Sequence, residues 1–332
     1  MNTLDKTAVV LLQLGGPDSL EAVEPFLYNL FCDPDIIDFP GAFLFRKKLA
    51  RLISKSRAPK VKELYKNIGG KSPILDQTRK QADALKKYFL ERQIDLRIYI
   101  AMRYWYPMTE EIVGELIQDQ IKRLILLPLY PHYSRTTTGS SVNEFKRILK
   151  KRKIEDQFHY SLVHSYPVQS SYIQSIIDRI NKSILKFSIE DRDKVHLVFS
   201  AHGTPLKLVR EGDPYSHQIR STYEAVLLNG NFNLPSTLCF QSKVGSQRWL
   251  KPSLVNTIAD LAGRGVSHML VIPIAFVSEH LETLSEIGIE ARNQAMNLGV
   301  KHFEVMPALR DHPLYIQCLA ELVSEKLELN HG

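Results

Sequence analysis

Two histidines follow strongly apolar segments of the chain, and this residue type can handle both protons and metal ions. His202 comes directly after the apolar run 195–201, and His280 follows a second run, 268–277. An imidazole with an unperturbed pKa near ~6.5 can take up a proton at neutral pH. We therefore interpret His202 as a candidate general base. A histidine that only caps a turn is the structural alternative.

Three glutamates follow the second apolar run at steps of four residues. Residues four apart on a helix lie about 6 Å from each other, so like charges repel. Ser278 can cap the start of such a helix, and the helix dipole favours acids in its first turn. The later acids are either a solvated face or a path of oxygen ligands for a weakly held transition metal. The candidate metal ligands are His202, Glu282, Glu286 and Glu290.

Aromatic and hydroxyl side chains lie near the ends of other apolar segments, where they suit a flat ligand that carries acidic groups. Trp249 follows a short apolar run and a polar turn, and flat apolar walls with a few polar groups fit an aromatic ligand. Arg57, Tyr65 and Ser72 can receive ligand carboxylates. The hydroxyl-rich run 136–141 (TTTGSS) can do the same, or it can be a solvated loop with helix-capping residues.

Apolar segments alternate with amphipathic ones, which is typical of parallel sheets with helices on both faces. Strands are predicted at 7–14, 96–102, 123–130, 158–164, 195–201, 237–241, 268–277 and 303–306. Helices are predicted at 74–91, 109–119, 170–185, 215–228, 251–264 and 313–328. The halves also match, since Val9–Pro17 resembles Leu197–Pro205. The sequence predicts an α/β fold of two similar Rossmann-like domains, each a parallel β-sheet flanked by helices, with the active-site cleft between them.

The repeat also predicts the domain boundaries. The first domain is expected at 1–165, the second at 166–310, and a C-terminal helix at 311–332 packs back on the body. The first half is longer, which indicates an inserted lip at about 26–72. Within this lip the stretch 39–62 contains apolar and basic residues and no acid. Such a segment can rest on anionic lipid headgroups, or it can be a helix with a solvated basic face.

Composition limits the class of protein. The chain has 332 residues, of which 44% are hydrophobic and 24% charged, as in soluble globular proteins. No run approaches the ~20 apolar residues of a membrane span, and no signal peptide is recognised, which predicts a cytoplasmic protein. Cys32, Cys239 and Cys318 are far apart, so a cysteine-built metal site is not expected. The net charge of +7 is concentrated beside apolar residues, which favours a membrane surface over nucleic acid.

Ordered motifs over nearly the whole chain resemble the ferrochelatase family. They are LGGP (14–17), YKNIGGKSPI (65–74), MRYWYPMTEE (102–111), LPLYPHYSRTTTGSS (127–141), SAHGTP (200–205), GDPY (212–215), FQSKVGSQRWL (240–250) and SEHLETLSEIGIE (278–290). The resemblance implies insertion of ferrous iron into protoporphyrin IX to give protohaem with release of two protons. This is the last step of haem biosynthesis.

The resemblance also implies roles for individual residues. His202 and Glu282 match the catalytic pair that is also regarded as iron-binding, and His280 matches a second histidine of the pocket. The residues implied to contact the porphyrin are Arg57, Tyr65, Ser72, Arg103, Tyr104, Tyr130, Trp249 and Phe276. Iron is then a substrate, and neither a permanently bound cofactor nor an iron–sulfur cluster is expected. The iron can enter on the His202 face or on the Arg103 and Tyr104 face.

Two other functions stay open at this point. One is a cobalt or nickel chelatase that acts on another tetrapyrrole, and the other is a non-catalytic carrier of haem or porphyrin. The lip and the absence of a histidine-rich tract argue against the first, and the acidic row argues against the second. The expected partners are protoporphyrin IX, Fe2+ and an anionic membrane surface, without nucleic acid. We expect a monomer or weak homodimer in the cytoplasm, peripheral to the inner membrane.

Overall fold

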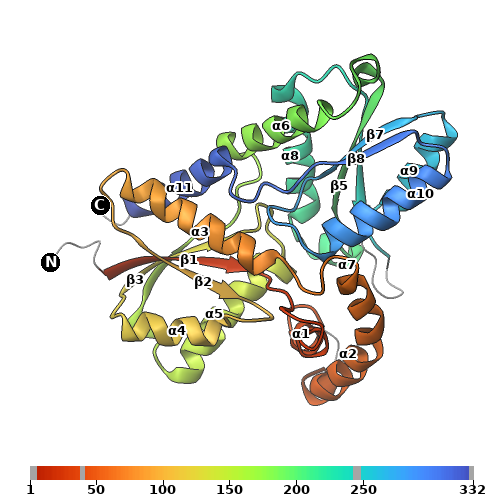
Figure 1. The fold of residues 1–332 in the computed structure, drawn as a ribbon. Coiled ribbons are helices and arrows are strands. Elements are labelled where there is room, and N and C mark those ends of the chain that lie inside the picture. Colours follow the sequence, from red (N-terminus) through yellow and green to blue (C-terminus); the bar gives the residue numbers. More distant parts are fainter. Residues whose placement is uncertain (1–5, 38–41, 242–247, 329–332) are drawn as a thin grey trace. The chain divides into compact units, whose positions relative to one another are not determined.

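The computed structural model describes residues 6–37, 42–241 and 248–328, without the side chains of 42–44 and 328. The chain divides into two compact units, one of residues 1–165 with 316–332 and the other of residues 166–315. In the described residues each unit contains a four-stranded sheet in which all neighbouring strands are parallel (Figure 1). The predicted α/β class with two parallel sheets is confirmed.

The sheet of the first unit has the strand order β2-β1-β3-β4. Its strands are β1 (Thr7–Gln13), β2 (Arg97–Met102), β3 (Arg123–Pro128) and β4 (His159–Leu162). Every residue of β1 is buried, as expected for a central strand with helices on both faces. Val10 and Leu12 point to one face, where they belong to the same core as Val113 of α4 (Thr109–Gln118) and Phe145 of α5 (Ser140–Arg152).

Helix α3 (Ile74–Leu90) covers the opposite face of this sheet (Figure 1). Along the chain, two further helices come between β1 and α3. They are α1 (Val23–Phe31) and α2 (Ala42–Lys66), which occupy the segment predicted as the lip. Most of α11 (Pro313–Glu328) also belongs to the first unit. The short helices η2 (Arg135–Gly139) and η3 (Glu155–Gln157) flank α5.

The sheet of the second unit has the order β6-β5-β7-β8, which repeats the connectivity of the first sheet. Its strands are β5 (Val195–His202), β6 (Ser236–Gln241), β7 (His268–Pro273) and β8 (His302–Val305). The prediction of a strand over 268–277 was too long. After Pro273 the N–H of Ile274 still donates to Ser200 O at 3.0 Å, but a turn from Pro273 to Phe276 then ends the strand.

Helices also surround the second sheet (Figure 1). They are α6 (Ser170–Ile184), η4 (Ile189–Lys194), α7 (Leu206–Arg210), α8 (Tyr215–Gly230), α9 (Leu254–Gly263), η5 (Glu282–Ala291) and α10 (Arg292–Asn297). One core joins Val198 and Val271 of the sheet to Ile258 of α9 and Ile287 of η5. Within the described residues, no helix has the length and apolar character needed to cross a membrane.

Candidate functional site

The two segments predicted to carry the chemistry meet at one edge of the second sheet. His202 is the last residue of β5, and the neighbouring strand β7 ends at Pro273. Because the strands are parallel, their carboxyl ends lie at the same edge, where open α/β sheets bind ligands. Glu282 begins η5 shortly after β7, and its Oε2 lies 3.3 Å from Nδ1 of His202.

The His202–Glu282 pair favours the charged form of each partner. Burial alone lowers the pKa of His202, but the charge of Glu282, with a contribution from Glu286, raises it above its ordinary value. Burial likewise raises the pKa of Glu282, and the positive charge of His202 outweighs this effect, so this pKa lies below its ordinary value. The side chains are 35% and 29% exposed, so water screens their attraction. Since Nδ1 faces Glu282, Nε2 of His202 is the nitrogen available to a substrate.

A second imidazole, that of His280, also approaches Glu282. Its Nε2 lies 3.7 Å from Oε2 of the carboxylate. Burial lowers the pKa of His280, although the charges of Glu282 and Glu279 act in the opposite direction. The ring of Phe276 lies edge-on to both imidazoles, with its centroid 4.3 Å from that of His280 and 6.4 Å from that of His202. Phe276 therefore gives this cluster an apolar wall.

The helix after β7 begins later than the sequence suggested. Ser278 was expected to cap it, but residues 278–280 are not helical, and η5 follows Leu281. Glu279, which directly precedes His280, is 5% exposed. Its Oε1 accepts hydrogen bonds from the backbone N–H of Ala308 and from Nη2 of Arg310, both at 2.9 Å. Glu279 is thus a buried structural carboxylate.

The acidic row lies on a π-helix and not on an ordinary α-helix. Bonds from i to i+5 widen the turn, and such helices are frequent at functional sites. The row runs outward, since Glu282 and Glu286 are partly buried and Glu290 is exposed. A second stripe with the same spacing faces inward and consists of Thr283, Ile287 and Ala291. In the part of the chain that is described, no three His, Cys, Asp or Glu side chains are arranged to hold a metal ion.

Tyr215 and Trp249 also belong to this edge. Tyr215 entered the sequence analysis only within a motif, but its side chain is buried, and burial followed by the charge of Glu282 raises its pKa. Trp249 forms an antiparallel bridge with Pro205, which lies three residues after His202. Its Nε1 is buried and has no hydrogen-bond partner among the described residues. Trp249 therefore lies close to the segment that follows His202.

In the first unit, Arg103 and Tyr104 follow β2 at the carboxyl edge of the sheet. Both side chains end at Asp33, whose carboxylate is fully buried. Nη2 of Arg103 lies 3.0 Å from Oδ2 of Asp33, and the Tyr104 hydroxyl donates to the same oxygen at 2.6 Å. The hydroxyl of Ser140, at the start of α5, donates to it as well. Asp33 was not predicted from the sequence, because an acid after a helix has no periodic signal that reveals its burial.

Asp33 is charged despite its burial. Burial raises its pKa, but the charge of Arg103 and the hydrogen bonds from Ser140 and Tyr104 together place it below the ordinary value. Burial, followed by the charge of Asp33, raises the pKa of Tyr104. Arg103 also lines a hollow of about 330 Å³ with Tyr106 and neighbouring residues. The network therefore holds one guanidinium between a buried carboxylate and an open surface.

The other predicted site residues of the first unit differ in how far they are exposed to solvent. Tyr65 and Ser72 are 4% and 7% exposed, whereas Arg57 is exposed and lies over the ring of Phe31, 5.7 Å from its centroid. Ser72 approaches the GGP turn so closely that a Cβ on Gly16 would lie 2.5 Å from its Oγ. That contact explains the glycine. Tyr130 follows β3 and is partly buried, and burial raises its pKa.

The predicted site residues thus form two sets. Those of the second unit are His202, Trp249, Phe276, His280, Glu282, Glu286 and Glu290. Those of the first unit are Arg57, Tyr65, Ser72, Arg103, Tyr104 and Tyr130. The predicted cleft between the units stays a prediction.

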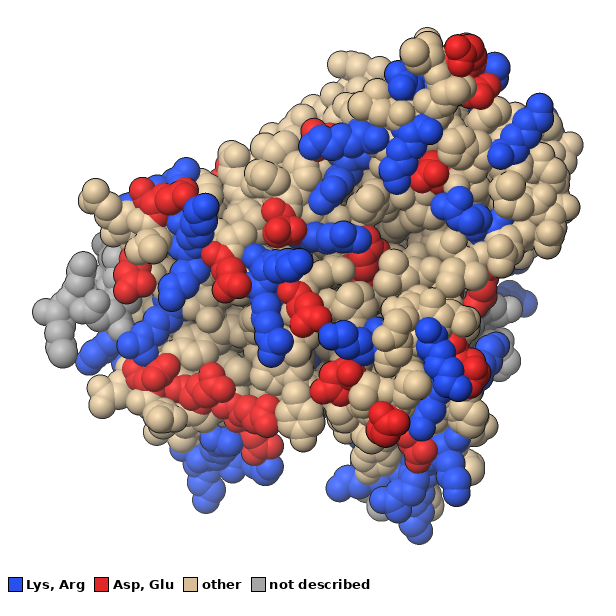
Figure 2. Space-filling model, viewed as in Figure 1, with Lys and Arg blue, Asp and Glu red and all other residues tan. Residues whose placement is uncertain are grey.

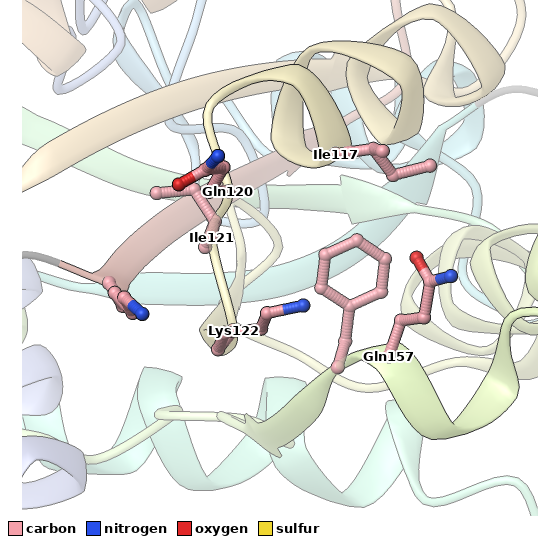
Figure 3. A pocket seen from close by; sticks show the side chains of 7 residues that line it. Ile117, Gln120, Ile121, Lys122 and Gln157 are labelled. Carbon is pink, nitrogen blue, oxygen red and sulfur yellow. The ribbon is translucent and has the colours of Figure 1, made fainter.

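A separate hollow lies at the opposite, amino edge of the first sheet (Figure 3). It measures about 210 Å³ and is lined by Lys6, Ile117, Gln120, Ile121, Lys122, Gln157 and Phe158. Both lysines and both glutamines are exposed, and none of the predicted site residues lines it. We assign no chemistry to this hollow.

Comparison with known proteins identifies the family of this chain. The family model described as ferrochelatase matches residues 6–327. The chain is 46% identical over 320 residues to a ferrochelatase of Geotalea uraniireducens, which covers 96% of this chain and 97% of the relative. The chain belongs to the ferrochelatase family. A family member from Gloeothece citriformis is 43% identical over 328 residues, or 98% of this chain and 84% of the relative.

Solved structures share the fold at low sequence identity. A structure of SirB from Bacillus subtilis with Fe3+ has a TM-score of 0.56 at 10% identity, and covers 96% of this chain and 95% of that chain. A sirohydrochlorin chelatase from B. subtilis subspecies spizizenii in complex with cobalt has a TM-score of 0.53 at 10% identity, with 97% and 96% covered. These likenesses concern the fold, and the family assignment makes the chain a metal chelatase.

We predict that Asp33→Asn destabilises the first unit by about 3–5 kcal/mol at pH 7, because it removes the nearer and more deeply buried of the two carboxylates that pair with the buried Arg103 guanidinium; the other is Glu144. The folded-state pKa of Asp33 is lowered, so its contribution is present above the unfolded pKa of ~3.9 and is lost as the pH falls below it. Urea unfolding at a series of pH values should therefore show a difference that shrinks in acid. The control Asp76→Asn removes an exposed ion-paired carboxylate and should cost less than about 1 kcal/mol. Equal losses in both variants would contradict the prediction.

We predict that Glu282→Gln lowers the pKa of His202 to below its ordinary value of ~6.5 in the metal-free protein. The carboxylate stabilises the imidazolium, and without it the effect of burial prevails. NMR titration of the His202 ring measures the shift directly and does not require activity. Glu290→Gln, at the exposed end of the row, serves as the control and should change this pKa much less. An unchanged His202 pKa in Glu282→Gln is the contrary result.

Proposed function

We propose that the protein inserts ferrous iron into protoporphyrin IX, giving protohaem and releasing two protons, as the last step of haem biosynthesis. The observation that carries this proposal is the contact of His202 with Glu282 at the carboxyl edge of the second sheet. The contact occurs in a chain of the ferrochelatase family. It joins the two residues that the motif resemblance implies to be the catalytic pair.

The reaction needs a group that accepts the pyrrole protons while iron loses its water. The neutral ring of His202 is the proposed acceptor at Nε2, because Nδ1 faces the carboxylate of Glu282 at 3.3 Å. Glu282 orients the ring and compensates the positive charge that forms on it. A planar macrocycle keeps its nitrogen lone pairs in the ring plane. Binding contacts at the periphery can therefore be used to bend it and expose those lone pairs to the ion.

The acidic row supplies a route between this pair and water. Glu282, Glu286 and Glu290 pass from partly buried to exposed along η5. Oxygen ligands with open positions for water hold a divalent ion weakly, as a substrate ion requires. The row can carry protons outward or iron inward. Phe276 and Trp249 provide the apolar walls for the flat substrate.

Residues of the first unit are assigned to the periphery and to the second face of the macrocycle. Arg57, Tyr65 and Ser72 are proposed to contact the propionates. Arg103 and Tyr104 are proposed to lie near the metal from the face opposite His202, and Tyr130 near the macrocycle. Iron entry on either face is compatible with this assignment. The proposal includes no permanent cofactor and no iron–sulfur cluster.

We predict that His202→Ala abolishes metallation while porphyrin still binds. Purified protein, ferrous iron and protoporphyrin IX are mixed without oxygen, and haem formation is followed by absorbance. Loss of a positioned general base reduces the rate by about 10²–10⁴-fold. Porphyrin binding, measured by fluorescence, should be nearly unchanged, because the walls remain.

The matched control is His217→Ala, which removes an exposed histidine of the same unit and should retain full turnover. Turnover retained in His202→Ala would exclude the proposed role. A parallel assay with coproporphyrin III identifies the porphyrin. Stoichiometric binding without turnover would favour a carrier, and activity only with cobalt or nickel would favour a chelatase of another tetrapyrrole.

We further propose that α2 rests on an anionic membrane surface. Lys and Arg gather on this helix (Figure 2), and Phe45 and Leu52 are 58% and 68% exposed among them. Because they are seven residues apart, they share a helix face with Lys48 and Lys55. An exposed apolar stripe flanked by basic side chains suits the interface of an anionic bilayer, where each cation contributes about 1 kcal/mol. The protein is then a cytoplasmic monomer or weak homodimer, peripheral to the inner membrane.

We predict that Phe45→Asp combined with Leu52→Asp reduces sedimentation with liposomes that contain anionic lipid by roughly tenfold or more. The change removes the exposed apolar side chains and adds repulsion from the headgroups. Leu228→Asp is the matched control, since Leu228 is 78% exposed on α8. Equal binding of the double variant, the control and the parent would exclude this surface. The predicted apolar residues Phe39, Phe43 and Leu44 lie outside the residues or side chains that the structure describes.

A further inference from the structure

The chain after β8 returns along the segment that carries His280. The N–H of Met306 donates to Val271 O at 2.8 Å, and the N–H of Arg310 donates to Val277 O at 2.7 Å. Between these two backbone contacts, the N–H of Ala308 donates to Oε1 of Glu279 at 2.9 Å. The segment 306–310 is therefore fastened beside the residues that lead to the site.

Arg310 is the charged residue of the segment 306–310, and its side chain pairs with Glu279. Its Nη2 lies 2.9 Å from Oε1 of the carboxylate. The side chain of Glu279 is 7% exposed and that of Arg310 is 43% exposed, so the pair joins the interior to the surface. A buried carboxylate is stable only when charge and hydrogen-bond donors compensate it. Arg310 and the backbone of Ala308 supply such compensation.

The other oxygen of Glu279 connects this pair to His280. Oε2 accepts a hydrogen bond from the hydroxyl of Thr283 at 2.7 Å. The hydroxyl oxygen of Thr283 in turn accepts from the backbone N–H of His280 at 3.1 Å, and the N–H of Thr283 donates to Nδ1 of His280 at 3.2 Å. With Nδ1 used as an acceptor, the neutral ring carries its hydrogen on Nε2. This is the nitrogen that lies 3.7 Å from Glu282.

We propose that Arg310 is a positioning residue for the metallation site, which acts through Glu279 and Thr283 to fix the ring of His280 toward Glu282. Arg310 lies outside every motif that carried the family resemblance. It touches neither His202 nor Glu282 in the contacts described above, and the hydrogen-bonded chain through Glu279 and Thr283 is the link to His280 that these contacts form. The inference rests on the proposed function, since it assigns a support to that same site.

The first experiment compares Arg310→Met with Arg310→Lys and with Arg264→Met. Met keeps the length of the side chain without its charge or donors, and Lys restores a charged donor. Arg264 is an exposed arginine of the same unit that pairs with Asp260, so its replacement is the matched control. We expect kcat of Arg310→Met to fall by roughly tenfold or more, with KM for both substrates changed less than about twofold. Arg310→Lys should recover much of the rate, and Arg264→Met should match the parent.

The second experiment observes the ring itself by NMR of protein with ¹⁵N-labelled histidine, at a pH at which the ring is neutral. The parent should show the shift of an acceptor Nδ1 at His280. Arg310→Met should show a mixture of the two tautomers, because the link that fixes the ring is weakened. Thr283→Val breaks the same hydrogen-bonded chain. The variant that carries both Arg310→Met and Thr283→Val should therefore lose little more kcat than the single variant with the larger loss.

The outcomes separate this inference from the proposed function. Unchanged kcat or an unchanged His280 signal in Arg310→Met overturns the positioning role, and so does a rate loss that adds fully to that of Thr283→Val. If Arg310→Met does not fold, Arg310→Lys and Thr283→Val are compared instead. A His280 ring signal in Thr283→Val that equals the parent's signal overturns the positioning role. If the parent protein metallates no porphyrin, only the proposed function is wrong. The NMR signal of the His280 ring still tests the link from Arg310 to His280 in that case.

Discussion

The carboxylate of Glu282 lies 3.3 Å from a ring nitrogen of His202 and 3.7 Å from one of His280, and the chemistry of the second sheet edge depends on this contact. Without the carboxylate, burial would make both imidazoles poorer bases. With it, one ring becomes more basic than usual while the other is the less basic of the two. The two imidazoles thus differ in basicity, because the anion outweighs burial at His202 and burial outweighs the anion at His280. Strand β5 and the segment after β7 must both be in place, because β5 ends at His202 and the later segment carries His280 and Glu282.

Buried carboxylates support the candidate residues in both units. Asp33 holds Arg103 and Tyr104 in the first unit, and Glu279 holds Thr283 beside His280 in the second. Each is costly to bury alone and is stable because donors from distant parts of the chain converge on it. Such a network fixes the direction of side chains that apolar packing leaves free to rotate.

The sequence was most informative where the physical signal is local. Buried parallel strands appear as continuous apolar runs, so the eight strands were predicted to within a few residues, except that the run ending at Val277 hid the turn after Pro273. His202, His280 and Glu282 could be singled out because polar residues directly after such runs lie at the binding edge. The π-helix was not predictable, since acids at steps of four fit either helix type. Asp33 and Arg310 were missed because their partners are distant in sequence and leave no periodic pattern.

The two sheets share one strand order, and their registers make their edges directly comparable. Leu12 pairs with Pro128 in the first sheet, as Ser200 pairs with Pro273 in the second. Two residues further along, the first sheet has Leu14 and the second has His202. The same backbone position therefore accepts a hydrocarbon in one copy of the motif and an imidazole in the other. The fold does not require a histidine at this position, since the first sheet has leucine there. The histidine of the second sheet is explained by the carboxylate of Glu282 beside it.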